Sequence, residues 1–199
     1  MAGPRALLFL SIPWYGRPME AIQEKKAVQE PIPVAIGLGG NIGDAETCVL
    51  SAIARLGSEP WLSNVCASSL YKTEPWGEPN QPEFINAVIT GITDWRAEQI
   101  LERLHAIESE YGRVRYTRYG PRTLDLDLIL LGDQCIESER ASVPHPEYRQ
   151  RAFVLAPLVE IAPEWLDPIT GLRIEQLWAN LGDPGTATRI DGQVTVCAG

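Results

Sequence analysis

The sequence predicts an α+β fold, a ferredoxin-like βαββαβ sandwich built as a single domain. Segments with strand-like and helix-like patterns follow one another in the order β-α-β-β-α-β, which is the split βαβ arrangement. The chain has 199 residues, of which 45% are hydrophobic and 22% charged. This composition suits one globular domain with tails.

The first predicted strand begins near Val34 and leads into a glycine-rich stretch, GLGGNIG. We expect these glycines to form a tight turn into a helix that Asp44 caps at its N-terminus. They could instead let the backbone approach a ligand near Asn41. The segment 45–57 carries apolar residues at helical spacing and is the predicted helix.

A pair of strands and a second helix come next. Segments 61–73 and 84–93 have β-like patterns, and the prolines and glycines between them indicate a loop. Segment 94–112 is the clearest predicted helix, with Asp94 as its expected N-cap and Gly112 at its end.

The last predicted strand lies in GPRTLDLDLILLGD (120–133), and short helical pieces follow over 147–163. Beyond Asp167 the periodicity is weak. The predicted organisation is an N-terminal extension, a catalytic domain and a C-terminal extension, over residues 1–31, 32–166 and 167–199.

Charge and cysteine content narrow the classes of function and location. A net charge of −9 argues against a general nucleic-acid or membrane surface. The four cysteines show no Cys-x-x-Cys spacing, and with two histidines a zinc site is not expected. Since no disulfide framework is indicated either, we expect a cytoplasmic location. The first 18 residues could be a signal peptide, but Pro13 interrupts their apolar run, so a disordered extension is favoured, with Met19 as an alternative start.

Two aspartates sit inside the leucine-rich strand. Asp125 and Asp127 project from one face, while Leu124, Leu126 and Leu128 project from the other. Two carboxylates roughly 6 Å apart repel by about 3 kcal/mol at an effective dielectric constant near 20. A cation beside them would remove this cost, although exposure at the start of the strand would also make the pair tolerable.

Four arginines precede the aspartates within ten residues of an otherwise acidic chain: Arg113, Arg115, Arg118 and Arg122. Carboxylates bind Mg²⁺ while leaving positions free for phosphate oxygens, and guanidinium groups hold those phosphates. Because no G-x-x-x-x-G-K-[ST] motif is present, the pattern indicates phosphoryl transfer without a P-loop. The alternative is a solvated loop whose arginines balance nearby glutamates.

YGPRTLDLDLILLGD resembles the signature of the 6-hydroxymethyl-7,8-dihydropterin pyrophosphokinase family. GLGGNIGD, SSLYKTEPWGEPNQPEFINAV and VPHPEYRQRAFVLAPLVEIAP resemble other family motifs in the same order, so the resemblance covers roughly residues 34–165. It implies transfer of pyrophosphate from ATP to the pterin in folate biosynthesis. We also expect a monomer that binds only these small molecules, and neither nucleic acid nor membrane.

The resemblance also implies site residues. Two Mg²⁺ ions would bind Asp125 and Asp127, and Arg113 and Arg122 would stabilise the transferring group. The implied ATP contacts are His105, Glu108, Arg115, Arg140, Ser142, His145 and Arg151. The implied pterin contacts are Thr73, Glu74, Trp76, Phe84, Asn86, Tyr119 and Phe153. Without the resemblance, Phe153 could equally be a core residue and His145 a turn residue.

Two other functions remain open from the residues. A palm-like nucleotidyltransferase or cyclase also uses paired aspartates on a ferredoxin-like sheet, and it would release pyrophosphate instead of AMP. A non-enzymatic module could use the arginines to bind an anionic partner, in which case Asp125→Asn would leave binding intact and no Mg²⁺ dependence would be seen.

Overall fold

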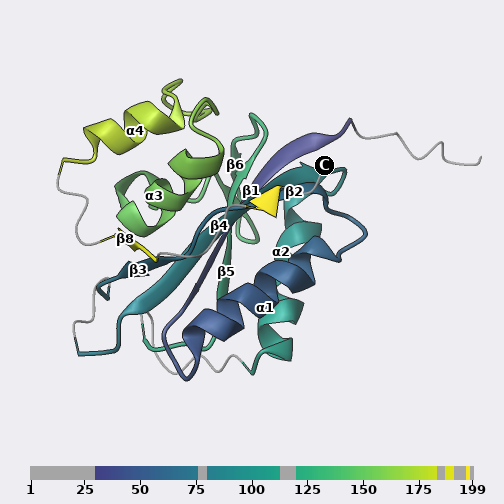
Figure 1. Ribbon diagram of the computed structural model, residues 1–199. Coiled ribbons are helices and arrows are strands. Elements are labelled where there is room, and N and C mark those ends of the chain that lie inside the picture. The colour runs from purple at the N-terminus through teal and green to yellow at the C-terminus, as the bar shows by residue number, and fades with distance from the viewer. Residues whose placement is uncertain (1–29, 76–79, 113–119, 183–186, 191–195, 198–199) are drawn as a thin grey trace, which may run out of the picture.

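An antiparallel sheet separates two layers of helices in the computed structural model (Figure 1). The structure describes residues 30–75, 80–112, 120–182, 187–190 and 196–197. The elements in chain order are β1 (Ile32–Gly40), α1 (Ala45–Gly57), β2 (Ser63–Ala67), β3 (Tyr71–Thr73), β4 (Phe84–Thr93), α2 (Ala97–Glu110), β5 (Asp125–Leu131), β6 (Ile136–Glu137), β7 (Ser142–Val143), α3 (Ala152–Ile161), α4 (Ile174–Asn180), β8 (Thr188–Arg189) and β9 (Val196–Cys197), with a 3-10 turn at Tyr148–Gln150.

The sheet has the order β5-β1-β4-β2-β9, and β3 pairs with both β4 and β8. Every pairing in it is antiparallel. The predicted combination of an antiparallel sheet and helices is confirmed. The expected strand over 61–73 is split into β2 and β3, because the Ser68 Oγ accepts a hydrogen bond from the Val88 N–H and interrupts the ladder.

Each face of the sheet packs against its own pair of helices, as Figure 1 shows. Alternation along the strands assigns neighbouring residues to opposite faces. Val34, Ile36 and Leu38 therefore pack with α1 and α2, whereas Ala35 packs with α3 and α4. Residues of β5 divide in the same way, and Leu126 and Leu128 are buried under α1 and α2, as predicted.

The helix starts confirm one predicted cap and correct the other. The Asp44 carboxylate accepts a hydrogen bond from the Thr47 N–H at 3.2 Å at the start of α1, as expected. Asp94 does not cap α2, which begins at Ala97. The first turn there is closed by Gln99, whose Oε1 accepts the Arg96 N–H at 3.1 Å.

The glycine-rich stretch was expected to be a turn, and this prediction is wrong for its first part. β1 runs through Gly37, Gly39 and Gly40, and only Gly43 has the positive φ, +68°, that a turn glycine provides. The extended backbone is held on both sides, by β4 and by β5. The absent side chains therefore serve close packing between strands, not a change of chain direction.

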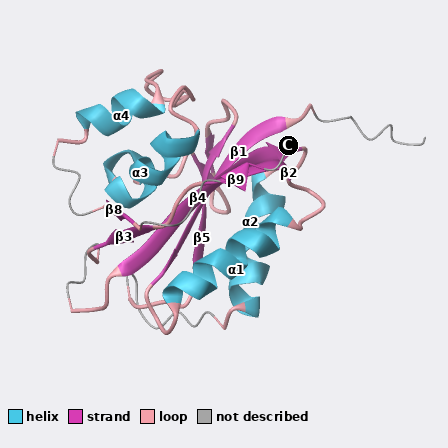
Figure 2. Cartoon of the chain, in the orientation of Figure 1, coloured by secondary structure: helices cyan, strands magenta, loops and turns pink. Residues whose placement is uncertain are grey.

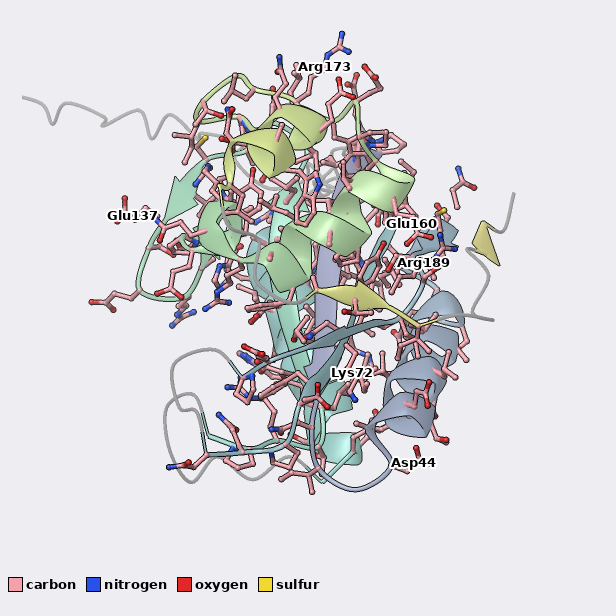
Figure 3. All side chains as sticks on the ribbon, turned by 60° about the vertical axis from the view of Figure 1, so that its left-hand side comes forward. Asp44, Lys72, Glu137, Glu160, Arg173 and Arg189 are labelled. Carbon is pink, nitrogen blue, oxygen red and sulfur yellow. The ribbon has the colours of Figure 1, made fainter. Side chains whose placement is uncertain are left out.

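The segment after residue 166 completes the second helical layer and two sheet edges. α4 packs with α3 in the second core, and β8 and β9 pair with β3 and β2 (Figure 2). Glu160 of α3 lies beside Arg189 of β8, with 3.6 Å between Oε1 and Nη2 (Figure 3). Weak hydrophobic periodicity did not predict these short strands.

Cys66 is disulfide-bonded, and the pairing of β2 with β9 places it opposite Cys197 in the register. This bond corrects the expectation that the chain has no disulfide, which rested only on the spacing of its cysteines. Cys48 and Cys135 have free thiols. Among the described residues, no helix is both long and apolar enough to cross a bilayer.

Candidate active site

Asp125 and Asp127 lie at one end of the sheet, on the face opposite α1 and α2. β5 begins at Asp125, and burial alternates along it, so that the leucines are enclosed while the aspartates stay partly accessible. The side chains of Asp125 and Asp127 are 17% and 37% exposed. The predicted division of this strand into an apolar and a carboxylate face is confirmed.

Glycines of β1 form a flat floor beside the aspartates. Gly39 lies opposite Asp125 on β5 and opposite Asn86 on β4, and Gly37 lies opposite Asp127. A Cβ atom on Gly39 would come within 2.6 Å of the Asn86 Oδ1. These positions are therefore kept free of side chains between the carboxylates and the next strand.

β3 and β4 form one wall of the site, across the glycine floor from the wall that carries the aspartates. Asn86 is buried and donates a hydrogen bond from Nδ2 to the Thr73 Oγ1 at 2.8 Å. Phe84 is opposite Thr73 in the register and is half-buried. An aromatic ring and a fixed amide at a sheet end suit a flat heterocycle, which needs an apolar face and hydrogen bonds at its rim.

Arg122 joins the two walls. It forms an ion pair with Asp125, and its guanidinium carbon lies 5.9 Å from the centre of the Phe84 ring. The Arg122 guanidinium thus offsets the repulsion that Asp125 feels from Asp127, and it also lies over the Phe84 ring. The structure brings this predicted catalytic arginine to the predicted position beside the aspartates.

A second cation comes from the segment before α3. The Arg151 Nη1 lies 3.7 Å from the Asp127 Oδ2, and Nη2 forms an ion pair with Glu147. Its guanidinium carbon lies 5.5 Å from the centre of the Phe153 ring. The Nε atom of Arg151 is buried and has no hydrogen-bond partner among the described residues.

His145 stands between this segment and β5, because its N–H donates to the Ile129 carbonyl at 3.0 Å. Burial lowers the pKa of His145, although the Asp127 carboxylate opposes the shift. Burial also raises the pKa of Asp127, and the neighbouring Asp125 carboxylate raises it further. The ionised form of Asp127 is therefore disfavoured unless a further cation lies beside it.

Glu108 of α2 is 2% exposed and reaches the same strand from the other side. Its Oε1 accepts a hydrogen bond from the Leu126 N–H at 2.7 Å. Leu126 lies between the two aspartates, so this bond fixes the backbone that carries them. The ATP contact implied for Glu108 remains a prediction.

The structure does not place the other predicted ATP and pterin contacts beside the two aspartates. His105 is exposed on α2, which covers the opposite face of the sheet. Arg140 and Ser142 are exposed in the β6–β7 hairpin, and Glu74 is exposed just after β3. Four predicted site residues lie outside the described residues: Trp76, Arg113, Arg115 and Tyr119.

The residues fit magnesium better than a softer metal. Asp125 and Asp127 offer hard oxygen ligands on one strand face, and Mg²⁺ commonly uses one or two carboxylates and completes its shell with phosphate and water. No group of three or more His, Cys, Asp or Glu side chains among the described residues could enclose a metal. An open site of this kind needs a phosphate ligand to be complete.

Asn41, directly after β1, lies beside the site, and the sequence indicated its importance only loosely. It is 4% exposed, and its side chain contacts the segments that lead into β4 and β5. The sequence signal that pointed to Asn41 was its position directly after the glycines. Its partners could not be identified, because they lie 40 and 81 residues away.

Comparisons with known proteins identify the family of this chain. The family model described as 7,8-dihydro-6-hydroxymethylpterin-pyrophosphokinase matches residues 35–163. A 2-amino-4-hydroxy-6-hydroxymethyldihydropteridine pyrophosphokinase of Synechocystis sp. is 44% identical over 142 residues, which cover 71% of this chain and 72% of that protein. The protein of the same name from Methylorubrum extorquens is 38% identical over 156 residues, covering 78% and 97%.

Solved structures show the same fold at low identity. The wild-type HPPK-DHPS protein of Plasmodium falciparum with SDX-DHP matches with a TM-score of 0.59 and 13% identity. The match covers 75% of this chain and 44% of that one, so the chain spans less than half of the solved protein. Because the family model matches residues 35–163, well over half of the chain, the chain belongs to the 7,8-dihydro-6-hydroxymethylpterin-pyrophosphokinase family, a family of ATP-dependent diphosphotransferases.

Proposed function

We propose that this chain transfers pyrophosphate from ATP to the hydroxymethyl oxygen of 6-hydroxymethyl-7,8-dihydropterin in a Mg²⁺-dependent reaction that releases AMP. The observation that carries the proposal is the meeting of two walls at one sheet end. Asp125, Asp127 and Arg122 form the charged wall, and Phe84 with Asn86 forms the wall suited to a heterocycle. Family membership supports the same reaction.

The pterin would lie on the glycine floor next to Phe84. Asn86 is held by Thr73, so its amide is oriented before the substrate arrives. Pre-set hydrogen-bonding groups lose little entropy on binding and select the rim of the ring. Phe153, with Arg151 beside it, would supply the second aromatic contact.

The triphosphate would lie over the aspartates and the two arginines. Arg151, whose Nη1 lies 3.7 Å from the Asp127 Oδ2, would turn an N–H to the phosphates, and Arg122 would exchange its ion pair with Asp125 for a phosphate oxygen. Guanidinium groups suit this role because they make paired hydrogen bonds to phosphate. Mg²⁺ held by Asp125 and Asp127 would neutralise charge on the phosphates.

The reaction needs little covalent chemistry from the protein. The pterin hydroxyl oxygen attacks the β-phosphorus in line, the bond from that phosphorus to the bridging oxygen of AMP breaks, and the hydroxyl proton is released. The protein's contribution is positioning and charge stabilisation. Arg113 and Arg115 are proposed to assist from the arginine-rich loop, with Tyr119 closing over the pterin.

The proposal extends to organisation. We infer that the catalytic domain is residues 32–166, supported by the family match to 35–163, and that its topology is ferredoxin-like, supported by the order β5-β1-β4-β2. We also propose that each site binds two Mg²⁺ ions and that the protein is a monomer. A cytoplasmic location stays a prediction. It was expected because the sequence indicated no disulfides, and the disulfide at Cys66 removes that support.

A product assay with ATP, Mg²⁺ and 6-hydroxymethyl-7,8-dihydropterin, run with and without the pterin, tests the proposal. Pterin-dependent AMP is the expected product. Release of free pyrophosphate would indicate nucleotidyl transfer and would overturn the proposed reaction. Absence of nucleotide turnover would overturn enzymatic function with this substrate.

A further inference from the structure

The Asn41 side chain connects two segments that approach the site from different parts of the chain. Its Nδ2 donates hydrogen bonds to the Gln81 Oε1 at 3.2 Å and to the Pro82 carbonyl at 3.1 Å. Its Oδ1 accepts a hydrogen bond from the Arg122 N–H at 2.9 Å. The backbone N–H of Asn41 also donates to the Arg122 carbonyl at 2.9 Å.

The two connected segments belong to the two walls of the site. Pro82 lies two residues before Phe84, which opens the wall proposed for the pterin. Arg122 lies three residues before Asp125 and is its ion-pair partner. A displacement of either segment relative to the other would therefore change the separation between the pterin and the phosphate-binding groups.

The amide group is chemically matched to this position. One end must accept a hydrogen bond from a backbone N–H, and the other must donate two hydrogen bonds to oxygens. Aspartate would keep the first contact but face the Pro82 carbonyl with an oxygen, and leucine would make none. With 4% exposure, water cannot easily replace the lost partners, so the loss is costly.

We infer that Asn41 is a positioning residue, which sets the distance between the pterin wall and the Arg122–Asp125 wall. The inference rests on the proposed function and assigns Asn41 no contact with reacting atoms. An error of about 1 Å in placing two reactants can cost on the order of a hundredfold in rate. Loss of Asn41 should therefore lower kcat by more than a change elsewhere that lowers the melting temperature equally.

The test compares three variants with the unmodified protein in the AMP assay and in thermal unfolding. We expect Asn41→Leu to lower kcat by roughly 10- to 100-fold, Asn41→Asp to lower it less, and Gln81→Ala to have the smallest effect. Asn41→Asp keeps the inference testable if Asn41→Leu does not fold. Hydrogen exchange should also show lost protection of the Arg122 amide in Asn41→Leu but not in Asn41→Asp.

Glu59→Gln is the matched control for stability, since Glu59 is buried against Arg103 and Trp61, away from the sheet end. It should lower the melting temperature while leaving kcat within about twofold of the unmodified value. A kcat within twofold for both Asn41 variants would overturn the inference, as would an equal loss of kcat in Glu59→Gln.

Failure of the proposed function would give a different result. If the unmodified protein makes no pterin-dependent AMP, the binding of the pterin in the presence of a non-hydrolysable ATP analogue decides the inference. Weaker pterin binding by Asn41→Asp than by the unmodified protein would support a positioning role. Equal binding, or no binding by either protein, would overturn it.

Discussion

Asp127 shows, at the scale of one residue, a conflict between folding and function. Burial and the adjacent Asp125 both raise its pKa, so its ionised form is disfavoured in the free protein. Arg151 compensates it only from 3.7 Å. A carboxylate kept in such a position is typical of a site whose ligand supplies the missing positive charge.

Replacing Asp127 by Asn should abolish most activity without unfolding the protein. We expect pterin-dependent AMP formation to fall by about a hundredfold or more, because one of the two carboxylates proposed to hold Mg²⁺ is lost. The free energy of unfolding should stay within about 1 kcal/mol or rise slightly, since repulsion from Asp125 disappears while Arg151 keeps its ion pair with Glu147.

Urea unfolding and the AMP assay check both parts of this prediction. Asp133→Asn, at an exposed position just after the same strand, serves as the control and should change neither quantity. A large loss of stability in Asp127→Asn would mean that the carboxylate is structural.

At the scale of elements, the approach of β1 to the segment before β5 places the site. The end of β1 passes so close to the Thr123 carbonyl that a Cβ on Gly40 would lie 2.3 Å from its oxygen. The Cys48 thiol of α1 donates to the same carbonyl at 3.3 Å. Strand, helix and preceding segment are thus fixed together at the point where Arg122 enters the site.

Gly40→Ala should therefore destabilise the protein and disturb the site. The new methyl group meets backbone, which cannot rotate away, and overpacking of this kind costs about 1–3 kcal/mol or more. Gly57→Ala is the matched control, because nothing lies within 4 Å of its Cβ position and alanine favours the helix. Thermal unfolding should show a lower melting temperature for the first variant and an unchanged or higher one for the second.

Glu160 of α3 holds β3 from the second helical layer. Its carboxylate accepts hydrogen bonds from the Ser69 N–H and Oγ and from the Tyr71 Oη at 3.1, 2.8 and 3.1 Å. Burial raises the pKa of Tyr71 to about 12, and the Glu160 carboxylate adds to that shift. α3 therefore supports the strand that carries Thr73.

Glu160→Gln should cost about 1–3 kcal/mol of unfolding free energy, because hydrogen bonds to a charged acceptor are replaced by weaker ones. The pKa of Tyr71 should fall but stay above its ordinary value, since burial is the larger cause. Urea unfolding and an NMR titration of labelled tyrosine measure the two effects. Glu164→Gln, at an exposed glutamate, is the control and should change the free energy of unfolding by less than about 0.5 kcal/mol. An unchanged Tyr71 pKa in Glu160→Gln would contradict the assignment.

At the scale of the whole molecule, elements with strong hydrophobic periodicity could be predicted from the sequence. Features that depend on which strands lie side by side could not. The two faces of β5 followed from alternation, and the N-cap of α1 followed from Asp44 standing just before a helical apolar pattern. The role of Asn41 and the glycine floor did not, because they depend on which strands lie side by side. Two-residue strands such as β8 and β9 exist only through the edges they join.

A buried ion pair ties the segment between α3 and α4 to the rest of the molecule and makes stability pH-dependent. The Asp167 carboxylate, fully enclosed, accepts hydrogen bonds from the Arg149 Nε and Nη2 at 2.7 and 2.5 Å. Burial alone would raise the pKa of Asp167, but the hydrogen bonds from Arg149 and Thr170 outweigh it and hold that pKa well below its usual range.

Because the folded pKa is depressed, the stabilisation by Asp167 is complete above the unfolded pKa of about 4 and declines as the pH falls toward the folded value. Asp167→Asn should thus cost about 3 kcal/mol at neutral pH. The difference from the unmodified protein should shrink at pH 3. Urea unfolding at both pH values tests this, with exposed Asp94→Asn as the control. A difference independent of pH would refute the assignment.

The late position of β8 and β9 in the chain has a consequence for synthesis on the ribosome. β3 emerges more than a hundred residues before β8, the strand that pairs with its outer side. At about 5–20 residues per second, this edge stays open for on the order of ten seconds. An unpaired edge is a template for pairing with another chain, so crowded polysomes should favour misassembly there until translation ends.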